Sequence, residues 1–208
     1  MSVSRLPPIA AVILAGGRGS RMGGALPKPL VPLAGQPLIA RVLARLGPSL
    51  RPVLISANEP QLYAGFGHPV LPDAVEGFAG PLAGLDAAAA WLAERAPGVE
   101  AVLTLPADTP FLPADLVPEL CAGPPGRVCV ASFEGHLQPT IAVWPLAKLR
   151  GLRALFRQTG NRSIRTLLER TGFETVTFPP DPAAPGGDPF FNVNTPEELE
   201  VAAACLSK

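Results

Sequence analysis

The residues best suited to chemistry lie in a glycine-rich, basic loop that follows an apolar run at residues 9–14. Glycines adopt backbone conformations that are closed to other residues, so main-chain N–H groups can approach an anion closely. Arginine and lysine add positive charge, and arginine binds phosphate through two parallel hydrogen bonds. The loop therefore predicts a phosphate site, whereas glycines alone would also fit a solvated turn. Its glycines are Gly16, Gly17 and Gly19, and its cations are Arg18, Arg21 and Lys28.

Two common nucleotide-binding fingerprints do not fit this loop. A P-loop requires a Gly-Lys-Ser/Thr triplet, whereas Gly24 is followed by Ala25. The dinucleotide pattern G-x-G-x-x-G fails because Met22 stands where its last glycine belongs. The loop therefore indicates phosphate binding of another kind.

The elements that must position this loop follow the pattern of an α/β fold. Short apolar runs alternate with helical stretches, and residues 9–14 are apolar without alternation, as in a strand buried on both faces. The 208 residues fit a single domain, residues 1–208, without repeats. The other expected strands are residues 53–57, 70–72, 101–105, 128–133, 140–144 and 175–178. The expected helices are residues 37–46, 81–96, 113–121, 146–158, 163–170 and 196–206.

Polar side chains stand where several expected strands end. The second strand ends at Ser56 and Asn58, the third ends at Asp73, and the fourth ends in the segment that contains Asp108. In open α/β sheets, ligands bind beyond the carboxyl ends of the strands. A carboxylate there can hold Mg²⁺, which prefers one or two carboxylates together with phosphate oxygens and water. Asp108 is therefore the candidate metal ligand, and a plain turn or helix-cap residue is the alternative.

A glycine-rich segment leads into the long alanine-rich helix expected at residues 81–96. Helix N-termini attract anions, and Gly80 and Gly84 permit close approach by a ligand or another backbone. Gly84 would equally ease the packing of that helix on the sheet. Both interpretations stay open from the sequence alone.

A second polar segment lies near the C-terminus. Asn192 and Asn194 alternate across Val193, so their amides share one side and can face a ligand. Thr195 and Glu198 then form a capping box, which is a purely structural device. The segment therefore combines a candidate binding pair with a helix start.

Composition excludes several classes of protein. Seventeen basic and seventeen acidic residues cancel, so no overall field favours nucleic acid. No signal peptide and no apolar run of membrane-spanning length is present, so we expect a cytoplasmic protein. His68 and His136 have no ligand spacing and are expected to be structural or solvated. The cysteines show neither metal nor redox spacing: Cys121, Cys129 and Cys205.

Several segments together resemble the molybdenum cofactor guanylyltransferase family, over nearly the whole chain from Val12 to Leu199. The loop L-A-G-G-R-G-S-R-M-G-G is shared across the nucleotidyltransferase superfamily. It implies a three-layer, Rossmann-like α/β fold with a mostly parallel, mixed sheet. The segments G-P-L-A-G, D-T-P-F-L-P and N-V-N-T-P-E narrow the resemblance to the family.

The resemblance implies transfer of GMP from GTP to molybdopterin, with Mg²⁺ as cofactor and pyrophosphate released. Positioning and charge neutralisation suffice for an in-line attack on the α-phosphate. The implied partners are GTP and molybdopterin, with molybdopterin-inserting enzymes and molybdoenzyme chaperones, and neither nucleic acid nor membrane. The implied catalytic residues are Arg21, Lys28 and Asp108, of which Asp108 binds the metal. The implied nucleotide site is Leu14, Ala15, Gly16, Gly17, Lys28, Ser56, Asp73 and Asp108, and the pterin site is Gly80, Pro81, Gly84, Asn192 and Asn194.

The chain departs from the family pattern at three places, which leaves the choice of nucleotide open. A-L-P-K-P at residues 25–29 stands where the family usually has Asp-Lys-Gly, Ser56 stands for an asparagine, and Gln138 for a histidine.

Four alternatives therefore remain. A molybdopterin cytidylyltransferase shares the loop, and a sugar-1-phosphate nucleotidyltransferase would explain P-K-P, although such chains are generally longer. An isoprenoid-precursor cytidylyltransferase usually carries His-Asp-x-x-Arg-Pro where this chain has Ala-Asp-Thr-Pro. A non-catalytic nucleotide-binding regulator would not need Asp108.

Overall fold

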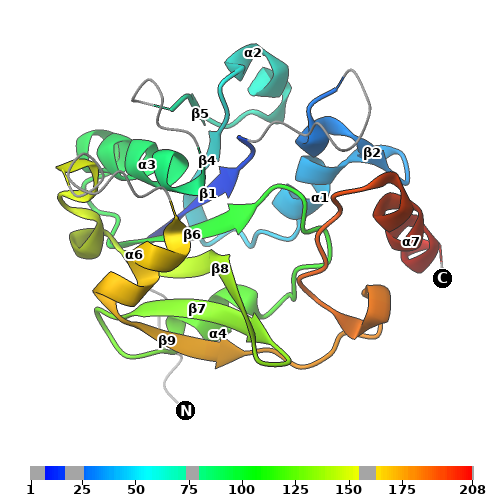
Figure 1. The fold of residues 1–208 in the computed structure, drawn as a ribbon. Helices are drawn as coiled ribbons and strands as arrows, with labels where there is room; N and C mark the ends of the chain where they lie inside the picture. The colour runs from blue at the N-terminus through cyan, green and yellow to red at the C-terminus, as the bar shows by residue number, and fades with distance from the viewer. Residues whose placement is uncertain (1–7, 17–25, 74–79, 155–162, 208) are drawn as a thin grey trace.

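The computed structural model describes residues 8–16, 26–73, 80–154 and 163–207. They fold around a seven-stranded sheet in the order β5-β4-β1-β6-β8-β7-β9 (Figure 1). Among these strands, β8 alone runs against the direction of the others. The expected α/β fold with a mostly parallel, mixed sheet is confirmed. The strands are β1 (Ile9–Leu14), β4 (Leu50–Ser56), β5 (Val70–Leu71), β6 (Ala101–Pro106), β7 (Val128–Phe133), β8 (His136–Pro145) and β9 (Phe173–Thr177).

Helices cover both faces of the sheet and complete three layers (Figure 1). On one face lie α1 (Leu38–Ala44) and α4 (Leu116–Cys121), and on the other lie α3 (Pro81–Arg95) and α6 (Ile164–Thr171). Alternate side chains of β1 enter the two cores, so this strand is buried on both faces as expected. No helix in the described ranges is long and apolar enough to cross a membrane. The shorter helices are α2 (Pro60–Tyr63) and 3-10 turns at Lys28–Leu30, Ala64–Phe66, Leu146–Leu149 and Pro185–Gly187.

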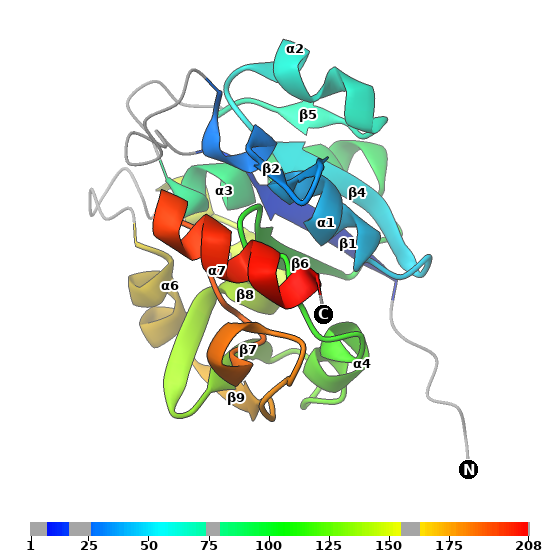
Figure 2. The same ribbon diagram turned by 90° about the vertical axis from the view of Figure 1, so that its right-hand side faces the viewer.

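A third, smaller core attaches the C-terminal segment to the carboxyl edge of the sheet. Helix α7 (Pro196–Leu206) lies beside a small hairpin of β2 (Pro32–Leu33) and β3 (Gln36–Pro37), as Figure 2 shows. Val193 and Ala202 are completely buried in this core, together with residues of the hairpin. The core therefore holds the residues before α7 next to the loop that follows β6.

Two elements differ from their expected bounds because of local turn chemistry. Strand β8 begins at His136, four residues before the expected start at residue 140, because a two-residue turn joins it to β7. Glu134 and Gly135 form that turn with φ of 48° and 78°, the backbone of a tight hairpin. Helix α4 begins at Leu116, since its N–H donates to Pro113 O in a preceding turn instead of opening the helix at residue 113.

The segment expected to form a helix at residues 146–158 is not one continuous helix in the part that the structure describes. A 3-10 turn spans Leu146–Leu149, and residues 152–154 are helical. The remaining residues, from 155 onward, lie outside the described ranges. Arg153 nevertheless joins this segment to α3, because its guanidinium donates to Asp86 on that helix.

Candidate active site

The carboxyl ends of β1, β4 and β6 meet at one edge of the sheet and hold the start of the glycine loop. Leu14 pairs with Ser56 on one side and with Pro106 on the other. Beyond the strand, Ala15 N donates to Ser56 O at 2.9 Å and Ala107 N donates to Leu14 O at 3.2 Å. The loop therefore leaves the sheet between β4, which ends at Ser56, and β6, which ends two residues before Asp108.

Lys28 lies at the centre of a polar cluster at this edge. Its Nζ donates to Asp108 Oδ2 and to Asn194 Oδ1, the latter at 2.5 Å. The Lys28 and Asp108 side chains are only 14 % and 22 % exposed, so water screens their attraction poorly. Asp108 and Asn194 lie 80 and 166 residues from Lys28 along the chain, so the fold alone assembles the three. We call them the lysine cluster.

The second carboxylate oxygen of Asp108 is suited to binding a cation. Asp108 Oδ1 is buried and has no hydrogen-bond partner among the described residues. A buried acceptor without a partner is costly and typical of a position that a ligand completes. A divalent cation fits because Mg²⁺ prefers carboxylate oxygens. Since no group of three or more His, Cys, Asp or Glu that could hold a metal occurs in the described ranges, phosphate oxygens and water would complete its coordination.

Asn192 and Asn194 reach this edge because the backbone between them is fixed to the loop after β6. Val193 N donates to Asp108 O at 3.0 Å, and the Val193 side chain is completely buried. The hydroxyl of Thr109, also completely buried, donates to Asn192 Oδ1 at 2.7 Å. The structure thus brings both asparagines beside the Asp108–Thr109 pair.

The helix start after Asn194 holds this segment from the other side. Thr195 Oγ1 accepts from Glu198 N at 3.2 Å and the Glu198 carboxylate accepts from Thr195 N at 3.0 Å, so the expected capping box is confirmed. Glu198 Oε2 also accepts from Asn194 N at 2.5 Å. The cap therefore fixes the backbone of a residue in the lysine cluster as well as the helix.

Asn58 and Asp73 form a second polar pair at the ends of β4 and β5. Asn58 Nδ2 donates to Asp73 Oδ2 at 2.9 Å, and Asp73 N donates to Asn58 Oδ1 at 2.8 Å. The reciprocal bonds fix the direction of the Asp73 carboxylate. They leave the other Asp73 oxygen without a protein partner among the described residues.

Gly80 and Gly84, at the start of α3, are glycines for different structural reasons. Gly80 is exposed and has φ of 111°, a conformation that side chains disfavour, immediately before Pro81 opens the helix. Gly84 packs on the sheet: a Cβ there would collide with Ser56 Oγ and lie 2.9 Å from Leu14 Cδ2. Packing therefore explains Gly84, and pterin contacts of these three residues remain a prediction.

The structure places some predicted residues and leaves others unplaced. Gly16 is exposed at the end of the described part of the loop. Gly17 and Arg21 lie outside the described residues, so their roles remain predictions. Thr109 was missed by sequence reasoning, although it directly follows Asp108, because a threonine after a carboxylate is an ordinary turn residue. Glu198 was interpreted as a helix cap only, since its bond to Asn194 N is not implied by the motif.

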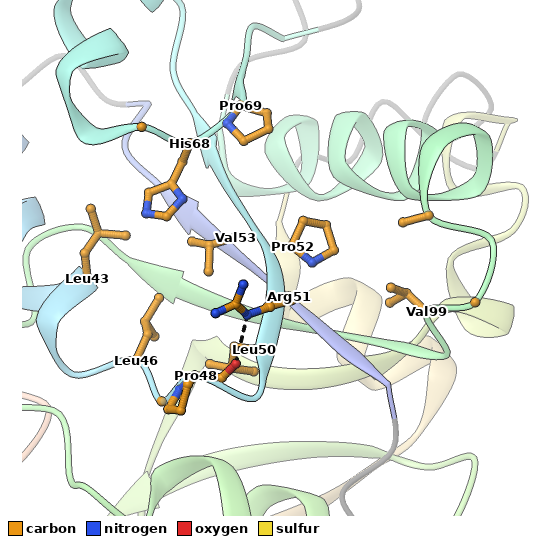
Figure 3. A pocket seen from close by; sticks show the side chains of 14 residues that line it. Leu43, Leu46, Pro48, Leu50, Arg51, Pro52, Val53, His68, Pro69 and Val99 are labelled. Atoms are coloured by element: carbon orange, nitrogen blue, oxygen red, sulfur yellow. Dashed lines mark hydrogen bonds between the residues drawn. The ribbon is translucent and has the colours of Figure 1, made fainter.

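A separate hollow lies at the opposite edge of the sheet (Figure 3). This cavity of about 770 Å³ is bounded by the residues that lead into β4, β5 and β6. Arg51 and His68 border it, but the Arg51 guanidinium donates to Pro48 O at 3.1 Å. None of the candidate site residues lines the cavity. Converging polar groups therefore locate the candidate active site, and this hollow lies apart from it.

The mixed sheet and the cation–carboxylate pair at its carboxyl edge fit a nucleotidyltransferase, which is the class of the family model that the chain matches. Comparison with known proteins narrows this class. Residues 11–176 match the model of the MobA-like NTP transferase domain. The chain belongs to that family.

Relatives and solved structures agree with this assignment. The chain is 43% identical over 202 residues to the molybdenum cofactor guanylyltransferase of Mesorhizobium japonicum, covering 95% of this chain and 96% of that protein. It is 42% identical to the protein of the same name from Rhizobium meliloti, covering 99% and 94%. Among solved structures, molybdopterin-guanine dinucleotide biosynthesis protein A from Archaeoglobus fulgidus has a TM-score of 0.69 at 24% identity, covering 96% of this chain and 98% of that one. This structural likeness supports the fold.

Proposed function

We propose that this protein is a molybdenum cofactor guanylyltransferase, which transfers GMP from GTP to the phosphate of molybdopterin. A phosphate oxygen of the acceptor attacks the α-phosphorus of GTP, the α–β phosphoanhydride bond breaks, and pyrophosphate leaves. The observation that carries the proposal is the lysine cluster at the strand ends, in a chain 43% identical to a protein of that name. Two further expectations go with it: a cytoplasmic location and protein partners that receive the product.

The nucleotide would lie at the carboxyl ends of β1, β4 and β5. Backbone groups of residues 14–16 would hold it, because the main chain there leaves the sheet at its carboxyl edge, and Gly17 is expected to extend this contact. Asp73, oriented by Asn58, would accept hydrogen bonds from the nucleoside. The direction of its carboxylate is already fixed in the protein, so binding would require little reorganisation.

Asp108 would hold Mg²⁺ through its unpartnered Oδ1. When bound, the ion neutralises negative charge on the phosphate oxygens during transfer. Lys28 would exchange its contacts with Asp108 and Asn194 for phosphate oxygens and so stabilise the departing pyrophosphate. Arg21 would add a second positive charge from the glycine loop.

The acceptor would approach from the side of α3 and α7. Gly80, Pro81 and Gly84 lie at the start of α3, and the asparagines on either side of Val193 precede α7. The side-chain amides of Asn192 and Asn194 can donate to the phosphate of the pterin substrate. The acceptor and the nucleotide would then meet at the lysine cluster.

Nucleotide choice provides the direct test of this function. The purified protein is incubated with Mg²⁺, molybdopterin and GTP, CTP or ATP in turn, and pyrophosphate release is measured. We expect GTP to be preferred at least about fivefold, because an unpaired polar edge of a wrong base costs about 1–3 kcal/mol. No transfer with any nucleotide would contradict the proposal.

A molybdopterin cytidylyltransferase is the second candidate, favoured by one observation. Ser56, where the family has an asparagine, is buried against the backbone of Gly84 and offers no amide to a base. A preference for CTP over GTP in the same assay would support this candidate and leave the metal and lysine roles intact.

A further inference from the structure

Two side-chain amides near Asp108 have their oxygen atoms engaged by the protein. Asn194 Oδ1 accepts from Lys28 Nζ at 2.5 Å, and Asn192 Oδ1 accepts from the Thr109 hydroxyl at 2.7 Å. An ammonium group only donates, so the oxygen of Asn194 must face Lys28. Neither Nδ2 group has a protein partner within the described ranges. Both amides therefore offer donors, and not acceptors, to a ligand.

The orientation of the Asn192 amide depends on Thr109. Thr109 is completely buried, and its hydroxyl makes no other hydrogen bond to the described residues. If the amide were turned over, the hydroxyl proton would lose its acceptor in a site that water does not reach, which is unfavourable. Asn192 itself is exposed, so the amide would be free to turn if Thr109 did not hold it.

We propose that Thr109 is a positioning residue for the acceptor substrate: its hydroxyl fixes the Asn192 amide so that Nδ2 donates to an oxygen of the acceptor's phosphate monoester. This inference rests on the proposed function. Phosphate oxygens accept hydrogen bonds, so an Asn192 amide that presented its oxygen would repel them. Thr109 acts through Asn192 and does not touch the reacting atoms.

The expected effect of losing this hydroxyl is on acceptor binding. Thr109→Val keeps the shape of the side chain and removes its donor, which lets the Asn192 amide turn. We expect KM for molybdopterin to rise about tenfold, the loss typical of one hydrogen bond to a charged group. KM for GTP and kcat should stay within about twofold, because the lysine cluster keeps its contacts. Thr109→Ser retains the hydroxyl and should restore KM for molybdopterin.

Thr104 provides a matched control on β6. It is also completely buried, its hydroxyl donates to Ala142 O at 3.2 Å, and it accepts from Trp144 Nε1 at 3.1 Å. Thr104→Val removes these bonds in the core, and neither bonded partner is a residue of the candidate site. It should lower Tm by several degrees and leave KM for molybdopterin unchanged, which separates loss of stability from loss of positioning.

Two further variants complete the experiment. Asn192→Asp replaces the donor with a second oxygen at an exposed position, and should raise KM for molybdopterin more than Thr109→Val does. In Asn192→Ala, the additional Thr109→Val change should raise KM no further, because Thr109 has no amide left to orient. An additive loss in that double variant, or an unchanged KM in Thr109→Val alone, would overturn the inference while leaving the proposed function standing. An inactive wild-type protein would overturn both.

Discussion

Two of the ion pairs among the described residues, Lys28–Asp108 and Arg153–Asp86, join distant parts of the chain and differ in construction. In the lysine cluster, Lys28 contacts one oxygen of Asp108 and leaves the other buried without a partner among the described residues. In the other pair, Arg153 Nε and Nη2 both donate to Oδ2 of Asp86, which lies on α3, at 3.0 and 2.7 Å. In the proposed function a ligand completes the first pair, whereas the second pair holds two packed segments together. An ion pair with an unpartnered buried atom indicates a functional site, and a paired guanidinium fork indicates structure.

The difference predicts that turnover and stability depend on different pairs. Breaking the structural pair removes the two hydrogen bonds that join Arg153 to Asp86 on α3, so unfolding becomes easier. Breaking the proposed catalytic pair, Lys28–Asp108, should remove a group that acts only when substrate is present. The following variants test this separation, beginning with the largest expected effect.

Asp108→Ala should reduce nucleotidyl transfer by at least about three orders of magnitude, because it removes the candidate metal ligand. The fold should survive, since the change also removes a buried oxygen without a partner. Pyrophosphate release measures the first effect and circular dichroism the second. Near-normal turnover would show that Asp108 is an ordinary loop residue.

Lys28→Ala should slow transfer by about a hundredfold, roughly the loss when one charge-stabilising group is removed. GTP binding should weaken too, because Lys28 is expected to contact the triphosphate in the bound state. Titration calorimetry with GTP and steady-state kinetics measure the two effects. A change of less than twofold in both would assign Lys28 to structure, alongside Arg153.

Sequence reasoning singled out Lys28 and Asp108 as candidate catalytic residues but did not predict their contact. Asp108 was predicted because it ends a strand beside a phosphate loop, and topology alone brings strand ends together. Its bond to Lys28 spans 80 residues and depends on how the small hairpin and α7 pack, which no local pattern encodes. For the same reason, the chain order gave no sign that Asn58 pairs with Asp73.

The fold was more predictable than the contacts because it rests on periodicity. The unbroken apolar run of β1 and the alanine-rich stretch of α3 were placed closely, since burial on two faces and helix length are local properties. The early start of β8 was not predicted, because Gln138 and Pro139 are unusual in a strand and the turn before it determines the pairing.

Asp86→Ala should lower the free energy of unfolding by about 1–3 kcal/mol, less than for a fully buried pair because the Arg153 side chain is 41% exposed and can reach water. The loss corresponds to a fall in Tm of roughly 2–4 °C per kcal/mol. The kcat of the folded protein should remain within twofold of wild type. A large fall in kcat without loss of stability would place the pair in the active site and remove the contrast.

The Arg127–Glu174 pair extends the comparison to an exposed ion pair. Neither of its side chains is buried, and neither carries a buried atom without a partner. Its Nη2–Oε1 distance is 3.0 Å, as short as a good ion pair, but the side chains are 44% and 46% exposed. Water screens such a pair and side-chain entropy opposes it, so Arg127→Ala should cost only about 0.2–1 kcal/mol. The effect should shrink further in 1 M NaCl, where the screening length falls to about 3 Å. Thermal melts of this variant and of Asp86→Ala, at low and high salt, measure both effects in parallel. If Arg127→Ala lost as much stability as Asp86→Ala, distance and not burial would determine what an ion pair contributes to this fold.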